Sequence, residues 1–231
     1  ILEALDRTGL ARNTLVVYCS DHGDMAGEHG CWWKSTYYEG SAGIPLIVRW
    51  PGVVKTASSS PTICNLTDLG TTFAAVAGTA FSSPVDGRSL LPVLAGERAT
   101  LEPDETYCEF AEFKTKGRPN YPCRMIRSGH WKLWYYADSD QLPPALFDLE
   151  KDPGETTDLA ARPECEEVRA SLMGKLLDGW NPRQVQTEAE DARACRDALW
   201  KWGAAFQPLT GDELTEPPDP SIEDSVQILP E

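Results

Sequence analysis

No stretch of this sequence approaches the roughly 18 consecutive apolar residues that a membrane-spanning helix requires. Basic residues are also scarce, because 21 Lys and Arg stand against 36 Asp and Glu, giving a net charge of −15. Nucleic acids and anionic membranes repel such an acidic chain, so we expect neither as a partner. The negative net charge does not exclude a small anionic ester as a substrate, because the electrostatic field at the binding site decides whether it binds.

The seven cysteines include no Cys-x-x-Cys pair, and seven is an odd number. Cys19 falls in an apolar run typical of a buried strand, and Cys165 and Cys195 fall in helical patterns. Buried free thiols in a cytosolic protein are the simplest explanation, so we expect a cytoplasmic location. Cys31 lies in a loop of special interest, but nothing near it resembles a reactive Cys–His couple.

The most informative stretch begins with an apolar, β-branched run at residues 14–19. Such a run predicts a strand buried on both faces, as in a parallel sheet covered by helices. A polar cluster, Ser-Asp-His-Gly-Asp at 20–24, starts where this strand ends. Because ligands of open α/β sheets bind outside the carboxyl ends of the strands, we expect the functional site here.

Three side chains of this region carry useful chemistry. Asp21 offers a hard oxygen ligand, and His22 offers an imidazole nitrogen that can reach the same ion if Gly23 turns the backbone. Lys34 supplies a mobile positive charge suited to a tetrahedral oxyanion. A metal and a lysine together suit a sulfate or phosphate ester. The alternatives are a simple turn at Asp-His-Gly and a surface role for Lys34.

The longer pattern resembles the type I sulfatases of the alkaline phosphatase superfamily. The matching motifs are Ser-Asp-His-Gly-Asp at 20–24, Gly-Glu-His-Gly at 27–30, Trp-Trp-Lys at 32–34, Tyr-Glu at 38–39 and Ile-Pro-Leu at 44–46. The resemblance implies that Asp21 and His22 are metal ligands and that Lys34 contacts the sulfate group. The family motif contains Asp-His or Asp-Asn, and this chain has Asp-His at residues 21–22. In this respect it is most similar to the choline-sulfatase and phosphonate monoester hydrolase branch.

One family motif is missing. The resemblance implies a formylglycine nucleophile made within Cys/Ser-x-Pro/Ala-x-Arg, and these residues contain no such motif. We therefore expect the chain to be the C-terminal portion of a longer sulfatase, inactive without its N-terminal portion. The absence of a visible signal peptide is then uninformative.

The fold class that we expect is α/β, with part of a mixed, mostly parallel sheet covered by helices and a small α+β subdomain. Residues 1–103 are predicted to belong to the catalytic domain, 104–180 to an antiparallel subdomain, and 181–231 to a C-terminal helix and an extended acidic arm. The segment Leu146–Leu159 resembles the sulfatase C-terminal signature, and we expect a structural role for it. His130, at a predicted turn, is an alternative site residue.

We predict hydrolysis of small-molecule sulfate esters through a metal-bound formylglycine. Family precedent favours Ca²⁺ as the metal ion, with Mn²⁺ second because imidazole suits transition metals. One alternative is a phosphonate or phosphate ester hydrolase of the same superfamily. An alternative of another class is a non-catalytic assembly module, using the acidic arm and the helix that carries Trp200 and Trp202. We also expect a homo-oligomer.

Overall fold

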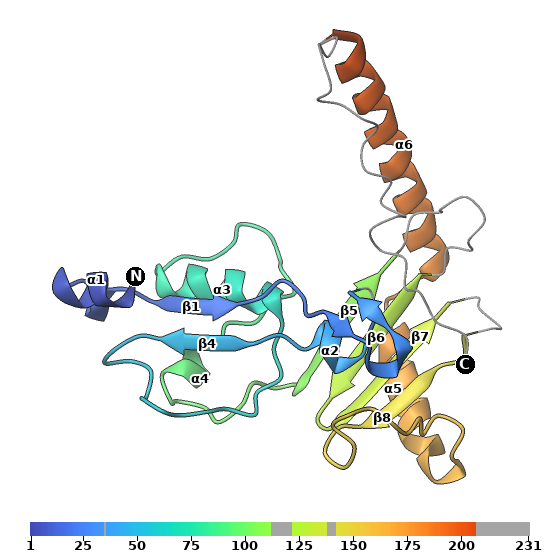
Figure 1. The fold of residues 1–231 in the computed structure, drawn as a ribbon, viewed down its shortest axis with the longest axis horizontal. Coiled ribbons are helices and arrows are strands. Elements are labelled where there is room, and N and C mark those ends of the chain that lie inside the picture. Colours follow the sequence, from blue (N-terminus) through green and yellow to red (C-terminus); the bar gives the residue numbers. More distant parts are fainter. Residues whose placement is uncertain (35, 112–121, 138–141, 207–231) are drawn as a thin grey trace. The chain divides into compact units, whose positions relative to one another are not determined.

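A computed structural model describes residues 1–34, 36–111, 122–137 and 142–206 (Figure 1). These residues form two compact units. The first contains Ile1–Gly23, Ala42–Thr106 and Arg127–Gly129, and the second contains the described residues of Asp24–Ser41, Tyr107–Ile126 and His130–Glu231. The linear division at residues 103 and 180 stays a prediction. Within the described ranges, none of the helices is long and apolar enough to cross a membrane.

The first unit is built on a pair of strands covered by helices. Its elements are α1 (Leu2–Arg7), η1 (Ala11–Asn13), β1 (Val16–Cys19), β4 (Leu46–Arg49), α3 (Leu66–Val76) and α4 (Leu91–Leu94). β1 and β4 lie side by side and pair antiparallel, with Cys19 opposite Leu46 (Figure 1). The core joins one face of this pair to the helices, through Val17, Cys19, Leu46, Leu69, Leu90, Val93, Leu94 and Leu101.

The predicted burial and pairing of these strands differ from the structure. β1 occurs where the apolar run at 14–19 predicts a strand, but β1 and β4 run antiparallel to each other, and the parallel sheet is not confirmed. The prediction that both of their faces are buried is wrong, because Tyr18 is 64% exposed and Ile47 is 61% exposed. These two residues are paired across the strands, and their face is opposite the one that packs on the helices.

Helix α3 begins at a side-chain cap. The Asn65 side chain accepts a 2.9 Å hydrogen bond from the Thr67 N–H, and the Asp68 carboxylate accepts one of 3.0 Å from the Asn65 N–H. This reciprocal capping box satisfies two N–H groups that the first turn leaves without helical partners. The helix ends at Val76, and Gly78 follows with a φ of +69°, which suits a glycine after a helix C-terminus.

The second unit contains most of a four-stranded sheet in the order β5-β6-β7-β8, while the first residues of β5 and the last of β6 fall in the first unit. Its elements are β2 (Met25–Ala26), η2 (Glu28–Gly30), β3 (Trp32–Trp33), α2 (Glu39–Ala42), β5 (Glu105–Phe110), β6 (Cys123–Ser128), β7 (Trp131–Tyr136), β8 (Ala145–Asp148), η3 (Pro163–Cys165), α5 (Glu166–Leu177) and α6 (Pro182–Phe206). The predicted turn at His130 is confirmed, because β6 ends at Ser128 and β7 begins at Trp131. β7 and β8 pair antiparallel and a helix follows the sheet, which is the expected α+β arrangement.

The two faces of this sheet have different coverings. One face packs on α5 through a core that includes Ile126, Leu133, Leu146, Leu172 and Leu176. Lys132 and Trp134 alternate with Leu133 along β7, so they point to the other face, where the segment Asp24–Ser41 packs. The sheet therefore supports the segment that carries Lys34.

The predicted C-terminal helix within residues 181–231 is α6. Trp200 and Trp202 on this helix are 43% and 63% exposed, so a docking role for them stays a prediction. The predicted acidic arm, residues 213–231, lies outside the described residues.

Candidate functional site

Asp21 lies just beyond the carboxyl end of β1, where the sequence places it. Its side chain is 83% exposed. Its Oδ1 atom accepts hydrogen bonds from the His22 N–H at 3.1 Å and the Ser20 hydroxyl at 3.4 Å. Hydrogen bonds from the backbone of Asp21 and His22 lower the pKa of this carboxyl, with a smaller contribution from the His22 ring. Asp21 is thus an exposed carboxylate, the form that a metal ligand requires.

The ring of His22 is oriented by its own backbone neighbourhood. Nδ1 lies 2.8 Å from the Gly23 carbonyl oxygen, and because a carbonyl can only accept, Nδ1 carries the proton. In the neutral ring, Nε2 then holds the lone pair that a metal would use, and a carbonyl partner of this kind is usual for metal-binding histidines. Nε2 lies 3.6 Å from Asp21 Oδ2. Two donor atoms at this separation can contact one cation.

Two side chains are too few for a complete metal site, because Ca²⁺ and Mg²⁺ usually have six or more ligands. Within the described ranges, one group of three or more His, Cys, Asp or Glu residues brings its ligand atoms within 4.8 Å of one another, and it does not contain Asp21 or His22. Asp21 and His22 therefore fit as two ligands of a larger metal site, and their role as metal ligands stays a prediction.

Lys34 follows a short hairpin in the second unit. β2 and β3 pair antiparallel, with Met25 opposite Trp33, and η2 makes the turn between them. Trp33, directly before Lys34, has a φ of +70°, a left-handed conformation that is costly for a bulky residue. Such strain is frequent at functional sites. Asp21 and His22 belong to the other unit, so the predicted approach of Lys34 to them stays a prediction.

The residues after Lys34 attach this segment to the sheet. The Tyr37 hydroxyl donates a 2.8 Å hydrogen bond to the Cys123 carbonyl oxygen of β6. The Tyr38 ring packs edge-on against Trp134 of β7, with 5.1 Å between ring centres, and stacks on His29 at 3.8 Å. Tyr37 and Tyr38 therefore hold the loop on the sheet, and His29 packs within the same segment.

A buried lysine, which the sequence analysis did not single out, completes this attachment. Lys132 has no exposed surface, and its Nζ atom lies 2.8 Å from Glu39 Oε1 and 2.8 Å from Glu155 Oε1. Glu155 Oε2 in turn accepts a hydrogen bond from the Glu39 N–H. We call these three residues the Glu39–Lys132–Glu155 cluster. The alternation of β7 places Lys132 on the same face as Trp134, but it does not show that this face is covered.

Other candidate residues have structural roles. Cys31 is buried, and burial raises the pKa of its thiol, so the reactive thiolate form is disfavoured. His130, Asp148 and Glu150 are the group of three described above. Asp148, however, lies 2.8 Å from Lys151 Nζ and accepts hydrogen bonds from the backbone N–H groups of Glu150 and Lys151. We therefore interpret this group as a turn that fixes the end of β8.

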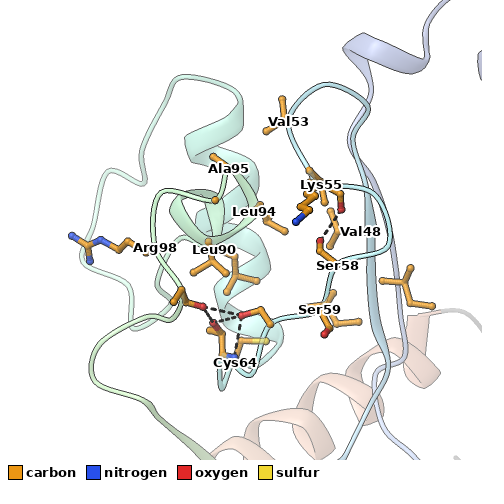
Figure 2. A pocket seen from close by; sticks show the side chains of 18 residues that line it. Val48, Val53, Lys55, Ser58, Ser59, Cys64, Leu90, Leu94, Ala95 and Arg98 are labelled. Atoms are coloured by element: carbon orange, nitrogen blue, oxygen red, sulfur yellow. Dashed lines mark hydrogen bonds between the residues drawn. The ribbon is translucent and has the colours of Figure 1, made fainter.

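The first unit also contains a cavity of about 540 Å³. Figure 2 shows Leu90, Leu94 and Ala95 on one side of it, with Val48 and Lys55 on the other. Its lining includes neither Asp21 nor His22. The cavity is therefore separate from the predicted site, and its mostly aliphatic and hydroxyl lining offers no carboxylate or imidazole to a metal.

The chain resembles known sulfatases over most of its length. Choline-sulfatase of Rhizobium meliloti is 38% identical over 175 residues, which cover 74% of this chain and 32% of that protein. Human arylsulfatase K is 34% identical over 208 residues, covering 87% of this chain and 37% of that protein. The chain thus spans about a third of the length of these curated relatives.

Solved structures agree with this relationship. The protein BT4656, in complex with its substrate D-glucosamine-2-N,6-O-disulfate, is 30% identical with a TM-score of 0.67, over 82% of this chain and 37% of that one. The phosphonate monoester hydrolase of Agrobacterium radiobacter is 29% identical with a TM-score of 0.61, over 76% of this chain and 36% of that one. The fold is therefore that of the sulfatases and their relatives.

Residues 27–181 match the family described as "N-sulphoglucosamine sulphohydrolase, C-terminal". This region is more than half of the chain, and it includes Lys34 and the Glu39–Lys132–Glu155 cluster. The protein therefore belongs to the sulfatase family.

Proposed function

We propose that this chain is the C-terminal portion of a sulfatase that hydrolyses small sulfate esters. The observation that supports this most is the donor pair Asp21 and His22, with Oδ2 and Nε2 3.6 Å apart at the end of β1 in a protein of this family. A structural turn requires neither the oriented imidazole nor the exposed carboxylate. The N-terminal portion of the enzyme would complete the site.

The residues of this chain would hold and orient the reacting groups. Asp21 Oδ2 and His22 Nε2 would hold a divalent cation, Ca²⁺ first and Mn²⁺ second, together with ligands from the N-terminal portion. When bound, this cation and the formylglycine expected upstream supply charge stabilisation and the nucleophile. The Nδ1–H bond to the Gly23 carbonyl keeps the His22 ring in the required orientation.

Lys34 would contribute a positive charge to the sulfate group. The sulfuryl oxygens carry negative charge that redistributes as the ester bond breaks, and a cation fixed nearby lowers the energy of that transition state. Lysine suits this task because its ammonium group is a compact charge that donates several hydrogen bonds. The proposed sulfate ester hydrolysis requires neither the paired carboxylates of a glycosidase nor the Ser-His pair of an esterase.

The test uses the enzyme with its natural upstream sequence and 4-nitrophenyl sulfate as the substrate. We expect Lys34→Ala to lower kcat/KM by about two orders of magnitude, the range for losing one charge-stabilising donor. The matched control is Lys201→Ala, which removes an exposed lysine of α6 and should leave kcat/KM within about twofold of wild type. An unchanged kcat/KM in Lys34→Ala would refute the assigned role.

A second measurement tests the metal ligands without relying on turnover. Calorimetric titration of the metal-free protein with Ca²⁺ or Mn²⁺ should show affinity that falls at least tenfold in Asp21→Asn and His22→Ala. Asp86→Asn, an exposed carboxylate of the same unit, is the control and should bind as wild type does. Equal affinity in all four proteins would place the metal elsewhere.

A phosphonate or phosphate ester hydrolase is the second candidate. It is favoured by the similarity to the Agrobacterium phosphonate monoester hydrolase, since a metal and a lysine accept either tetrahedral group. Comparing kcat/KM for 4-nitrophenyl sulfate and 4-nitrophenyl phenylphosphonate decides between the two. A preference for the phosphonate of more than tenfold would replace the sulfatase proposal.

A further inference from the structure

Two attachments, one on each side, constrain the position of Lys34 in the second unit. Before it, the β2–β3 pairing ties Met25 to Trp33, next to Lys34 in the sequence. After it, Glu39 is the first residue of α2 and contacts both Lys132 and Glu155. The backbone between these points is short, so the second attachment limits where the Lys34 side chain can reach.

The electrostatics of the second attachment depend on Glu39. A fully buried lysine is unfavourable unless carboxylates accompany it, and Glu155, with its side chain 2% exposed, forms a neutral pair with Lys132. That pair lies within the sheet and its following turn. Glu39 is a second carboxylate on the same ammonium, with its side chain 36% exposed, and it accepts the hydrogen bond that Lys132 donates, whereas Glu155 Oε1 is an ion-pair partner without a hydrogen bond.

The contacts of Glu39 connect the loop to the sheet and to the turn that follows it. Its side chain accepts a hydrogen bond from Lys132, 93 residues away, and its N–H donates to Glu155, 116 residues away. Both bonds involve a charged group, and bonds of this kind are shorter and stronger than neutral ones. Nearby, a Cβ added to Gly40 would lie 2.7 Å from the Met25 sulfur, which shows how tightly this end of the loop packs on the hairpin.

We propose that Glu39 is a positioning residue, which acts through Lys132 and Glu155 to hold Lys34 in the place where it meets the substrate. This inference rests on the sulfatase function proposed above. It assigns Lys132 and Glu155 to the support of an active-site loop, beyond their contribution to the core of the second unit. A displacement of about 1 Å in a catalytic group is enough to lower a rate by up to about 100-fold.

The first test measures hydrogen exchange of the backbone amides in the full-length protein. In Glu39→Ala, amides of residues 36–40 should exchange at least tenfold faster than in wild type, while those of β6 and β7 change by less than twofold. Glu164→Ala, an exposed glutamate near the start of α5, is the matched control and should match wild type throughout. Unchanged exchange at 36–40 would overturn the proposal, as would an equal increase across β6 and β7.

The second test is a double-mutant cycle on kcat/KM for 4-nitrophenyl sulfate. We expect Glu39→Ala alone to lower kcat/KM about tenfold, and Glu39→Gln, which keeps an acceptor for Lys132, to recover part of the loss. In the Lys34→Ala background, Glu39→Ala should change kcat/KM by less than twofold. An undiminished effect in that background would show that Glu39 does not act through Lys34, and the proposal would be wrong.

The two proposals fail in different ways. If Lys34→Ala retains full activity, the function proposed for Lys34 fails, and the exchange measurement still shows whether Glu39 holds the loop. If Lys34→Ala loses activity but Glu39→Ala changes neither exchange nor kcat/KM, only the positioning role fails. Should Glu39→Ala not fold, Glu39→Gln carries both measurements, with a smaller expected increase in exchange of about threefold.

Discussion

The Asp68 carboxylate accepts a 2.7 Å hydrogen bond from the backbone N–H of Arg88, 20 residues further along the chain. Its other oxygen caps the start of α3 at the Asn65 N–H. The Arg88 side chain in turn donates to the carbonyl oxygens of Ile63 and Glu105, each at 3.1 Å. One buried carboxylate thus connects the helix start to the Asp-Gly-Arg-Ser segment at 86–89.

Asp68→Asn should lower the free energy of unfolding by about 1–3 kcal/mol, because one of the two backbone N–H groups loses its acceptor in a buried position. An amide offers one oxygen where the carboxylate offers two. Urea denaturation followed by circular dichroism measures the change. The control is Asp86→Asn, an exposed residue of the same segment, and a similar loss in both variants would contradict the assignment.

Gly87→Ala should be strongly destabilising. A Cβ at this position would lie 2.2 Å from the Thr67 carbonyl oxygen and 2.8 Å from Thr71 Oγ1, so the backbone has to move. We expect a loss of about 2–3 kcal/mol, typical of overpacking. Gly174→Ala in α5 is the matched control, since its Cβ meets nothing within 4 Å and should stabilise the helix by up to about 1 kcal/mol. Urea unfolding midpoints that are equal for the two variants would show that the crowding at Gly87 is relieved without cost.

Tyr37→Phe tests the attachment of the Lys34 segment to β6. The Tyr37 side chain is buried, and its hydroxyl donates to the Cys123 carbonyl at 2.8 Å. Burial raises the pKa of Tyr37, which keeps the hydroxyl protonated as a donor. Losing this bond should cost about 1–2 kcal/mol in urea denaturation. Tyr18→Phe, at a tyrosine that is 64% exposed, should change stability by less than about 0.5 kcal/mol.

Asp152→Asn should change how stability depends on pH. Hydrogen bonds from the backbone of Thr156 and Thr157 lower the pKa of Asp152 below its usual 3.8, with burial opposing them. A carboxyl with a lowered folded-state pKa stabilises the protein above the unfolded value, and this contribution is lost as the pH falls through the folded value.

We therefore expect the urea midpoint of Asp152→Asn to be below that of wild type at pH 7, with the gap closing as the pH falls below about 3.8. Asp191→Asn, an exposed residue on α6, should follow wild type at every pH. A gap that stays constant from pH 7 to pH 3 would show that Asp152 does not contribute through its charge.

Local patterns in the sequence predict much of the secondary structure. The cap at Asn65 marks the start of α3, and the turn at Gly129 joins β6 to β7, because side-chain caps and glycine turns act on neighbouring backbone groups. The Asp-His cluster at the end of β1 is likewise visible in the sequence. These features depend on residues within a few positions of each other, and the chain specifies them before it folds.

The tertiary structure decides the features that join distant residues. Nothing local in the sequence shows that β1 and β4 pair antiparallel, or that Tyr18 and Ile47 are exposed on one face of that pair. Lys132 appears in the sequence as an ordinary strand residue, and it becomes a buried ion only because Glu39 and Glu155 converge on it from segments before and after β7. Such contacts depend on which faces pack together across the whole chain, so short-range propensity cannot specify them.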